Sequence, residues 1–246
     1  MSGKQGKKQG KKQGKKKESS RRPLSERRLV TPAMRNTAER LAGSSAWPIH
    51  RCITNAGWDE VGMAHIVLSR HHPSGGVALI GVLVDLNCLG IKHAYSFARL
   101  PMEEAEARTR LEDHSNLITA HLKPEDAAKI ISEGLKYGTS LGFAPHPGFG
   151  VSRLMLQGLD PSQSELEVPL GRNGRPCYVV GPEDSDTFFV EVIETLKAKV
   201  GEGNFDVEHV DHDEDGDPFT FDGGDEEGEE DGGFGAEVLP EVLMQK

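Results

Sequence analysis

The stretch MAHIVLSRHHPSGGVALIGVLVDL, residues 63–86, decides the fold that we predict for this chain. Its two halves, residues 63–70 and 77–86, are rich in aliphatic and β-branched residues, and the segment HHPSGG between them has the Pro and Gly residues typical of turns. The pattern predicts a β-hairpin with a loop of about six residues. Residues 77–86 are apolar at nearly every position, which indicates a central strand covered on both faces.

Helices are predicted on both sides of this hairpin. TPAMRNTAERLAG, residues 31–43, begins with Thr as N-cap and Pro at the first helical position and ends in Gly. Residues 102–122 form a charged segment that predicts one helix with a break near His114. Residues 123–143 and 184–201 have apolar side chains at helical spacing, and each segment has Gly at its expected end.

A second hairpin is predicted near the end of the apolar part of the chain. ELEVPLG (165–171) and RPCYVVG (175–181) flank Asn173 and Gly174, and Asn-Gly is the strongest short hairpin signal. We see no alternation of strands and helices of the βαβ kind. The predicted fold class is therefore α+β, with an antiparallel sheet built from two hairpins, packing helices and disordered charged tails.

The two ends of the chain carry opposite charges. Residues 1–28 contain twelve Lys or Arg and two Glu, a net charge of +10, whereas residues 203–246 contain sixteen Asp or Glu and one Lys, a net of −15. The overall charge of −10 thus leaves −5 for residues 29–202. Segments of such composition cannot bury enough apolar surface to offset chain entropy. We expect one globular domain at 29–202 between a disordered basic tail and a disordered acidic tail.

Cysteine usage and hydropathy predict a cytoplasmic protein. The three cysteines form no CxxC pair, and their odd number favours reduced thiols in a reducing compartment. The basic start is not followed by an apolar signal segment. No stretch approaches the roughly 18 apolar residues of a membrane span, so we expect no membrane partner.

The basic tail is the strongest functional signal. Its many cations are expected to neutralise nucleic-acid phosphates and release counterions. It has no aromatic residue to stack on bases, so such binding is expected to be independent of sequence. A solubilising tail without a dedicated ligand is the alternative. The residues predicted to contact nucleic acid are Lys7, Lys8, Lys11, Lys12, Lys15, Lys16, Lys17, Arg21 and Arg22.

The acidic tail has two predicted roles. It is the nearest partner for the basic tail, and tethering places the two at an effective concentration in the mM range, so an intramolecular contact is expected to mask the basic tail. Residues 211–222 also have oxygen ligands at the spacing of a calcium-binding loop, with Gly216 at the sharp turn. An acidic tail that matches through its density of Asp is the alternative. The predicted calcium ligands are Asp211, Asp213, Asp215, Asp217 and Asp222.

An enzymatic function is the rival hypothesis. Asp85 and Cys88 follow the buried strand, and His146 lies in the loop APHPGFG, where two prolines restrict the backbone. A desolvated carboxyl, a thiol and an imidazole would form a nucleophile and acid–base set for a small hydrolase or transferase. The structural alternative is that Asp85 caps the following turn, that Cys88 packs in the core and that Lys92 and His93 lie in water. His71 and His72 are adjacent, so their side chains are expected to point apart rather than share a metal.

Three segments carry a resemblance to known sequences. Residues 58–95, YGTSLGFAPH (137–146) and GRNGRPCYVVGP (171–182) resemble segments of uncharacterised bacterial proteins. The resemblance covers about residues 47–205 and implies a self-contained bacterial domain, without an activity, ligand or catalytic residue. Together these observations favour a non-catalytic binding or accessory protein without a cofactor, apart from calcium at residues 211–222.

Overall fold

The computed structural model describes residues 31–113, 119–181 and 184–209. The predicted phosphate-binding residues of the basic tail and the predicted calcium ligands lie outside these ranges. The helices are α1 (Pro32–Arg40), η2 (Ser44–Ala46), α2 (Trp58–Val61), α3 (Met102–Asp113), α4 (Pro124–Ser140), α5 (Phe149–Ser152), η3 (Arg153–Met155), η4 (Pro161–Gln163) and α6 (Asp186–Val200). The strands are β1 (Ile49–Asn55), β2 (Met63–His71), β3 (Val77–Asp85), β4 (Gly90–Leu100), β5 (Thr119–His121), β6 (Cys177–Val180) and β7 (Asp206–His209).

An antiparallel sheet is the centre of the described domain. Its strands follow the order β4-β3-β2-β1-β5. β2 and β3 pair in a continuous register from Met63 opposite Asp85 to His71 opposite Val77, so the predicted hairpin of residues 63–86 is confirmed. The turn between them requires glycine, because Gly75 and Gly76 have φ angles of 86° and 76°.

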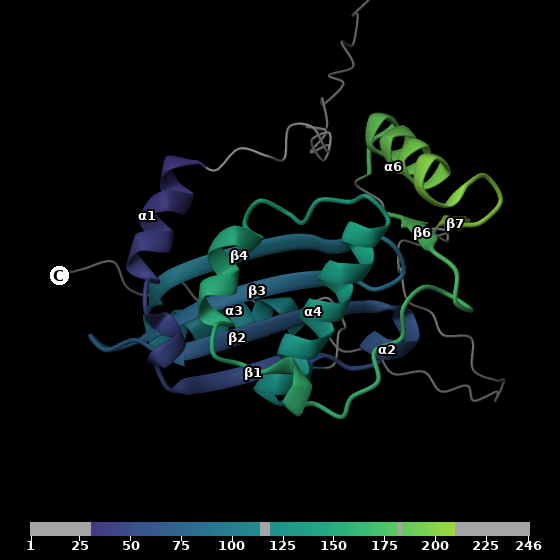
Figure 1. Cartoon of the computed structure of the whole chain (residues 1–246). Helices are drawn as coiled ribbons and strands as arrows, with labels where there is room; N and C mark the ends of the chain where they lie inside the picture. The colour runs from purple at the N-terminus through teal and green to yellow at the C-terminus, as the bar shows by residue number, and fades with distance from the viewer. Residues whose placement is uncertain (1–30, 114–118, 182–183, 210–246) are drawn as a thin grey trace, which may run out of the picture. The chain divides into compact units, whose positions relative to one another are not determined.

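Helices cover both faces of this sheet (Figure 1). α1, α4 and α5 pack on one face, where the buried residues of β3 are Ala78, Ile80, Val82 and Val84. α3 packs on the other face, where Ala105 meets Val77 and Leu79. Both sides of β3 are therefore in hydrophobic clusters, which confirms the prediction of a central strand covered on both faces and explains its nearly continuous apolar sequence.

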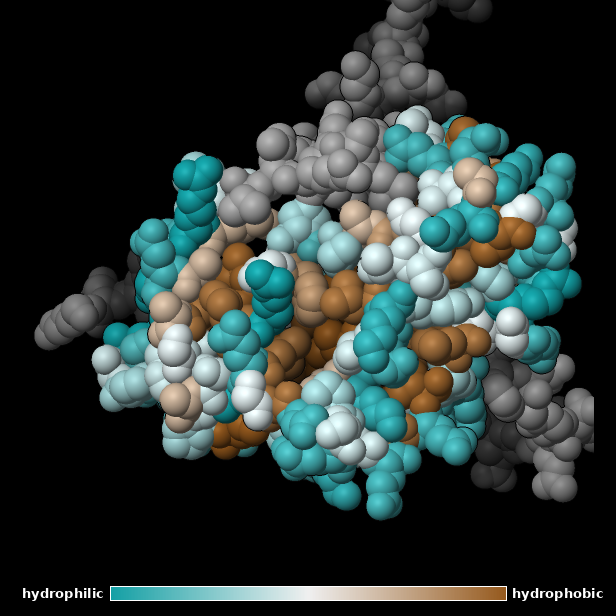
Figure 2. Space-filling view, in the orientation of Figure 1, coloured by the Kyte–Doolittle hydropathy of each residue, from teal (hydrophilic) through white to brown (hydrophobic). Residues whose placement is uncertain are grey.

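The face that carries α4 has separate hydrophobic and hydrophilic regions. Figure 2 shows hydrophobic residues gathered beside α4, over the sheet, and hydrophilic residues on the outward surface of the helix. This separation follows from the sequence of α4, in which Ala127, Ile130, Ile131 and Gly134 are buried. Spacings of three and four residues place these side chains on one side of the helix.

The predicted start of α1 and the predicted end of α6 agree with the structure, whereas α1 ends at Arg40, before the predicted stop at Gly43. Thr31 caps α1, since its hydroxyl accepts the backbone N–H of Met34 at 3.3 Å, and Pro32 follows as the first helical residue. Ser185 caps α6 in the same way, and Gly201 ends it with a φ of 88°. Local sequence signals thus placed the start of α1 and the end of α6.

The α+β class with an antiparallel sheet is confirmed, but the predicted second hairpin is not formed. A tight turn at Asn173 exists, with a bridge between Arg172 and Arg175, yet residues 165–170 form no strand. Pro169 has no N–H to donate. Instead, the N–H group of Gly171 donates to the carbonyl of Leu86, and the N–H group of Cys177 donates to the carbonyl of Asn87. The two segments thus bond to the turn between β3 and β4 where a local hairpin would have them bond to each other.

β6 pairs with β7 in parallel, and α6 connects the two strands. This unit corrects our expectation that the chain has no βαβ element. It also corrects the domain boundary, because β7 lies in the segment assigned by composition to the acidic tail. The ordered domain therefore extends beyond residue 202, to His209 at least.

The segment of residues 102–122 also differs from its prediction. α3 ends at Asp113, close to the predicted break, but Thr119–His121 form strand β5 rather than helix. β5 pairs antiparallel with β1, and Ala120 lies opposite Thr54. The hydrogen bonds to this edge of the sheet favour a strand over the helix that the local sequence predicts. Among the described residues, none of the helices combines the length and the apolar character needed to cross a membrane.

Candidate functional site

Asp85 ends the central strand β3, and its side chain holds the turn that follows. The carboxyl is 1% exposed, and Oδ1 accepts the backbone N–H groups of Asn87 at 3.0 Å and Cys88 at 2.9 Å. Asp commonly bonds the backbone two or three residues ahead in this way. The sequence left two roles open for Asp85, a catalytic carboxyl and a turn cap. These contacts are those of a turn cap.

The second oxygen of this carboxyl is unusual. Oδ2 of Asp85 is buried and has no hydrogen-bond partner. Burial raises the pKa of Asp85, while the charge of Lys92 and the backbone N–H groups act to lower it. Lys92 is itself only 8% exposed, so our expectation that it lies in water was wrong. The sheet therefore buries an acid and a nearby base at the end of its central strand.

Cys88 lies in the core. Its side chain has no exposed surface, and it packs with Leu141, Phe143 and Phe188. Burial, followed by the charge of Asp85, raises the pKa of the Cys88 thiol, whereas a nucleophile needs the thiolate. The geometry of Cys88 is thus that of a structural cysteine.

The other two thiols are also buried. Burial is the main reason that the pKa of Cys52 rises to about 12 and that of Cys177 to about 11. We expect all three thiols to react slowly with a disulfide reagent such as DTNB near pH 8 in the folded protein, because the thiolate is both scarce and shielded. In denaturant, three equivalents should react rapidly. Fast labelling of Cys88 with an unchanged near-UV circular dichroism spectrum would contradict this prediction.

His146 lies at the edge of the sheet beside β4. Its backbone N–H donates to the carbonyl of Ile91 at 3.0 Å, and its Nδ1 accepts the N–H of Gly148 at 3.1 Å. The ring lies against His93, with the ring centroids 4.6 Å apart. Of the three predicted catalytic residues, Asp85 and Cys88 are in contact, because Asp85 accepts the backbone N–H of Cys88. His146 contacts His93.

The described residues offer no cluster for a metal ion. In residues 31–113, 119–181 and 184–209, no group of three His, Cys, Asp or Glu side chains is arranged to hold one. His71 lies against His50 and His72 against Trp47, each pair with ring centroids 4.8 Å apart. The adjacent histidines thus contact different neighbours, as expected for successive residues of an extended chain.

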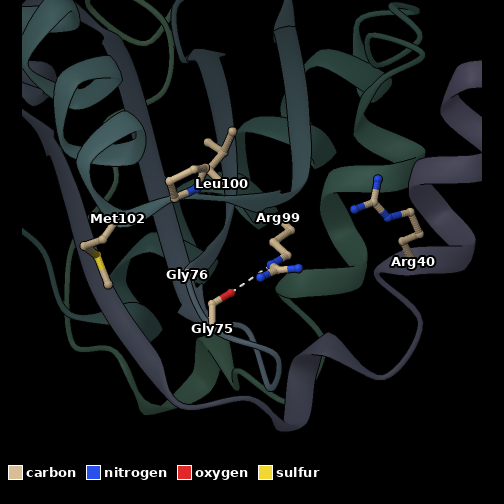
Figure 3. Close-up of a pocket in the computed structure, with 7 residues that line it drawn as sticks. Arg40, Gly75, Gly76, Arg99, Leu100 and Met102 are labelled. Atoms are coloured by element: carbon tan, nitrogen blue, oxygen red, sulfur yellow. Dashed lines mark hydrogen bonds between the residues drawn. The ribbon is translucent and has the colours of Figure 1, made fainter. Parts of the chain in front are cut away.

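A cleft that the sequence did not indicate lies beside the β2–β3 turn (Figure 3). It has a volume of about 380 Å³ and is lined by Arg40 of α1, Arg99 of β4, the turn glycines Gly75 and Gly76, and residues 100–102. Arg99 Nε donates to the carbonyl of Gly75 at 3.0 Å, and its Nη2 donates to that of Ser74 at 2.9 Å. The turn thereby holds the guanidinium in one orientation.

The two charged residues that line this cleft are both arginines. The ion pairs found within the described residues include neither Arg40 nor Arg99, so no described carboxylate lies within 4.0 Å of either guanidinium. Burial lowers the pKa of His72, and the charges of Arg99 and Arg40 lower it further. The two arginines are distant in sequence, which is why no local pattern pointed to them.

A second cleft has mixed charges. It measures about 240 Å³ and is lined by Asp59 and Glu60 of α2, by Asn87 and by Arg172. Arg172 is paired with Glu208 of β7. Its cation is thus already neutralised within the chain, in contrast to those of the first cleft.

Comparisons with protein-family models, with curated proteins and with solved structures found no match for this chain.

Proposed function

We propose that this protein is a non-catalytic binding or accessory protein whose basic N-terminal segment, residues 1–28, contacts nucleic acid or another acidic surface. The observation that carries this proposal is the net charge of +10 in that segment. Each Lys or Arg that neutralises a phosphate releases condensed counterions, and this release drives binding. The segment has no aromatic residue, so affinity should not depend on base sequence.

The state of Cys88 supports binding over covalent catalysis. A thiol that is fully buried and has a raised pKa is a poor nucleophile. Asp85 already accepts two backbone N–H groups in the same turn. Asp85 and Cys88 therefore have structural roles, and the proposed binding function does not require either residue to react.

The acidic segment is proposed to compete with nucleic acid for the basic one. Residues 203–246 carry a net charge of −15, and their attachment to the same chain gives an effective concentration around the mM range. The acidic segment should then prevent weak ligands from binding to the basic segment. A polyanion of high charge density should displace the acidic segment. Removal of the acidic segment is accordingly expected to increase affinity at low salt.

The test is fluorescence anisotropy of labelled duplex DNA and single-stranded RNA between about 50 and 200 mM salt. If the segment makes about four phosphate contacts, affinity for DNA should fall roughly 100-fold over that range. A full-length variant with Lys7, Lys8, Lys11, Lys12, Lys15, Lys16, Lys17, Arg21 and Arg22 replaced by Gln keeps the chain length and should lose most of the binding.

The position of β7 determines where a deletion of the acidic segment should begin. Truncation after residue 202 would remove β7, which pairs with β6, so the deletion should begin at Asp211. An unchanged affinity of this variant at low salt would exclude masking. Equal binding by the full chain and by the variant with nine Gln substitutions would contradict the proposed function itself.

A further inference from the structure

The first cleft has the features of a binding site for an anion. A guanidinium donates paired hydrogen bonds to phosphate or carboxylate, and these charge-assisted bonds are stronger than neutral ones. Here two guanidinium groups, Arg40 and Arg99, line the same cleft, and neither has a described carboxylate within ion-pair distance. Such an arrangement leaves two positive charges for a ligand to neutralise.

Arg99 is organised before a ligand arrives. The carbonyl oxygens of Ser74 and Gly75 hold it, and the remaining N–H donors of its guanidinium are not used by them. The turn that presents these carbonyls packs closely against the end of β4, since a Cβ at Gly76 would lie 2.2 Å from the carbonyl oxygen of Leu100. A donor held in place loses little side-chain entropy on binding, which favours affinity.

The rest of the lining sets the size and polarity of the ligand. Leu100, Pro101 and Met102 supply apolar surface, and the volume of about 380 Å³ lies in the range of small-molecule sites. We propose that the cleft lined by Arg40 and Arg99 binds a small phosphate monoester that carries an apolar group. The phosphate contacts the two arginines, and the apolar group packs against residues 100–102.

The residues that line this cleft do not belong to the basic segment 1–28, so the inference does not depend on the proposed nucleic-acid contact. The two also differ in chemistry. A phosphate bound by a charged segment alone gains nothing from an apolar substituent, whereas the cleft should prefer a ligand that has both parts. Phenyl phosphate is a suitable probe, with inorganic phosphate and phenol as its two halves.

The test uses the full-length protein at about 150 mM salt, where exposed charges are screened beyond roughly 8 Å. Isothermal titration calorimetry should show that phenyl phosphate binds more tightly than inorganic phosphate and that phenol does not bind. Arg40→Gln should weaken the binding of phenyl phosphate about tenfold, because it removes one charge-assisted contact. Arg40 is preferred to Arg99 for this test because Arg99 also holds the turn.

Arg35→Gln is the matched control. Arg35 is also an exposed residue of α1, but it does not line the cleft, so its replacement should leave the affinity unchanged. If both variants weaken binding equally, or if Arg40→Gln has no effect, the proposal is wrong. Equal affinities for inorganic phosphate and phenyl phosphate would overturn the assignment of an apolar group.

His72 provides a second readout by NMR. The charged groups that lower its pKa are Arg99 of β4 and Arg40 of α1, and a bound phosphate offsets both of them. Saturation with phenyl phosphate should therefore raise the pKa of His72 toward the ordinary value of 6.5. Phosphate held only by residues 1–28 would leave the titration of His72 unchanged, and that result would overturn the proposal.

Discussion

Replacement of Gly138 by alanine is expected to lower the free energy of unfolding by about 2 kcal/mol, because α4 and β4 meet there without room for a side chain. A Cβ at Gly138 would lie 2.7 Å from the Cα of Gly90 and 2.7 Å from the carbonyl oxygen of Leu89. Both are backbone atoms, so a change of rotamer cannot relieve the contact. The melting temperature should fall by roughly 4–8 °C.

This cost is a difference between two opposing effects. Alanine is the better helix former by about 1 kcal/mol, and overpacking of a tight contact costs about 1–3 kcal/mol, or more where the backbone must move. The clash should exceed the gain at Gly138, since α4 would have to move away from the start of β4. Gly134 lies one turn earlier in α4. A Cβ at Gly134 would lie 2.2 Å from Cγ1 of Val84, which is a side-chain atom.

Gly150→Ala is the control for this prediction. Gly150 lies in the short helix α5, and a Cβ there would meet no atom within 4 Å. Its replacement should leave the stability unchanged or raise it by up to about 1 kcal/mol. Thermal unfolding followed by circular dichroism measures both variants. Equal melting temperatures for Gly138→Ala and Gly150→Ala would contradict a tight contact between α4 and β4 at Gly138.

The second large effect is expected at Asp85. Its replacement by alanine leaves the N–H groups of Asn87 and Cys88 without their acceptor in a buried turn. Each unsatisfied buried donor costs about 1–3 kcal/mol, so the loss should be about 3 kcal/mol. Chemical denaturation measures it. Asp160→Ala is the comparison, because Asp160 accepts the N–H of Ser162 at an exposed helix start, where water replaces the lost bond and the change should be small.

Asp85→Asn isolates the effect of the charge. Burial raises the pKa of Asp85, so the folded protein retains a proton that the unfolded chain has already released. Stability that depends on this proton is fully present below the ordinary carboxyl pKa of 3.8 and is lost as the pH rises through the higher pKa of the folded state.

The free energy of unfolding of the wild-type protein, relative to that of Asp85→Asn, should therefore decrease above pH 3.8. The maximum slope is about 1.4 kcal/mol per pH unit. Denaturation in urea at a series of pH values tests this sign. A difference that grows in favour of the wild-type protein as the pH rises would mean that Lys92 and the N–H groups outweigh burial, contrary to our expectation.

The candidate site was predictable only in its local part. A carboxyl directly after an apolar strand and before LNCLG is typical of a turn cap, and the structure places Asp85 in that role. The environment of His146 was not predictable, because contact with His93 depends on how the loop after α4 runs along β4. Burial of Lys92 likewise depends on elements that lie far from it in sequence.

The second hairpin shows how tertiary contacts override a strong local signal. Asn173 and Gly174 form the predicted tight turn, with positive φ angles of 52° and 75°. The strands do not continue from it, because Cys177 donates to Asn87 and β6 pairs with β7. Turn chemistry determines a change of direction, whereas strand pairing depends on which partner is available in the folded chain.

The sequence by itself determined the hairpin of residues 63–86, the helices with their capped ends and the opposite charges of the two chain ends, because apolar period, capping and composition act over a few neighbouring residues. Only the tertiary structure decided the burial of Asp85 with Lys92, the parallel pairing of β6 with β7 and the meeting of Arg40 with Arg99 in one cleft. The two paired strands and the two arginines are far apart in the chain, whereas Asp85 and Lys92 belong to the consecutive strands β3 and β4 and are buried by the elements that pack on the sheet. Arg40 and Arg99 share a cleft because α1 and β4 both lie beside the β2–β3 turn, an arrangement that no local pattern encodes.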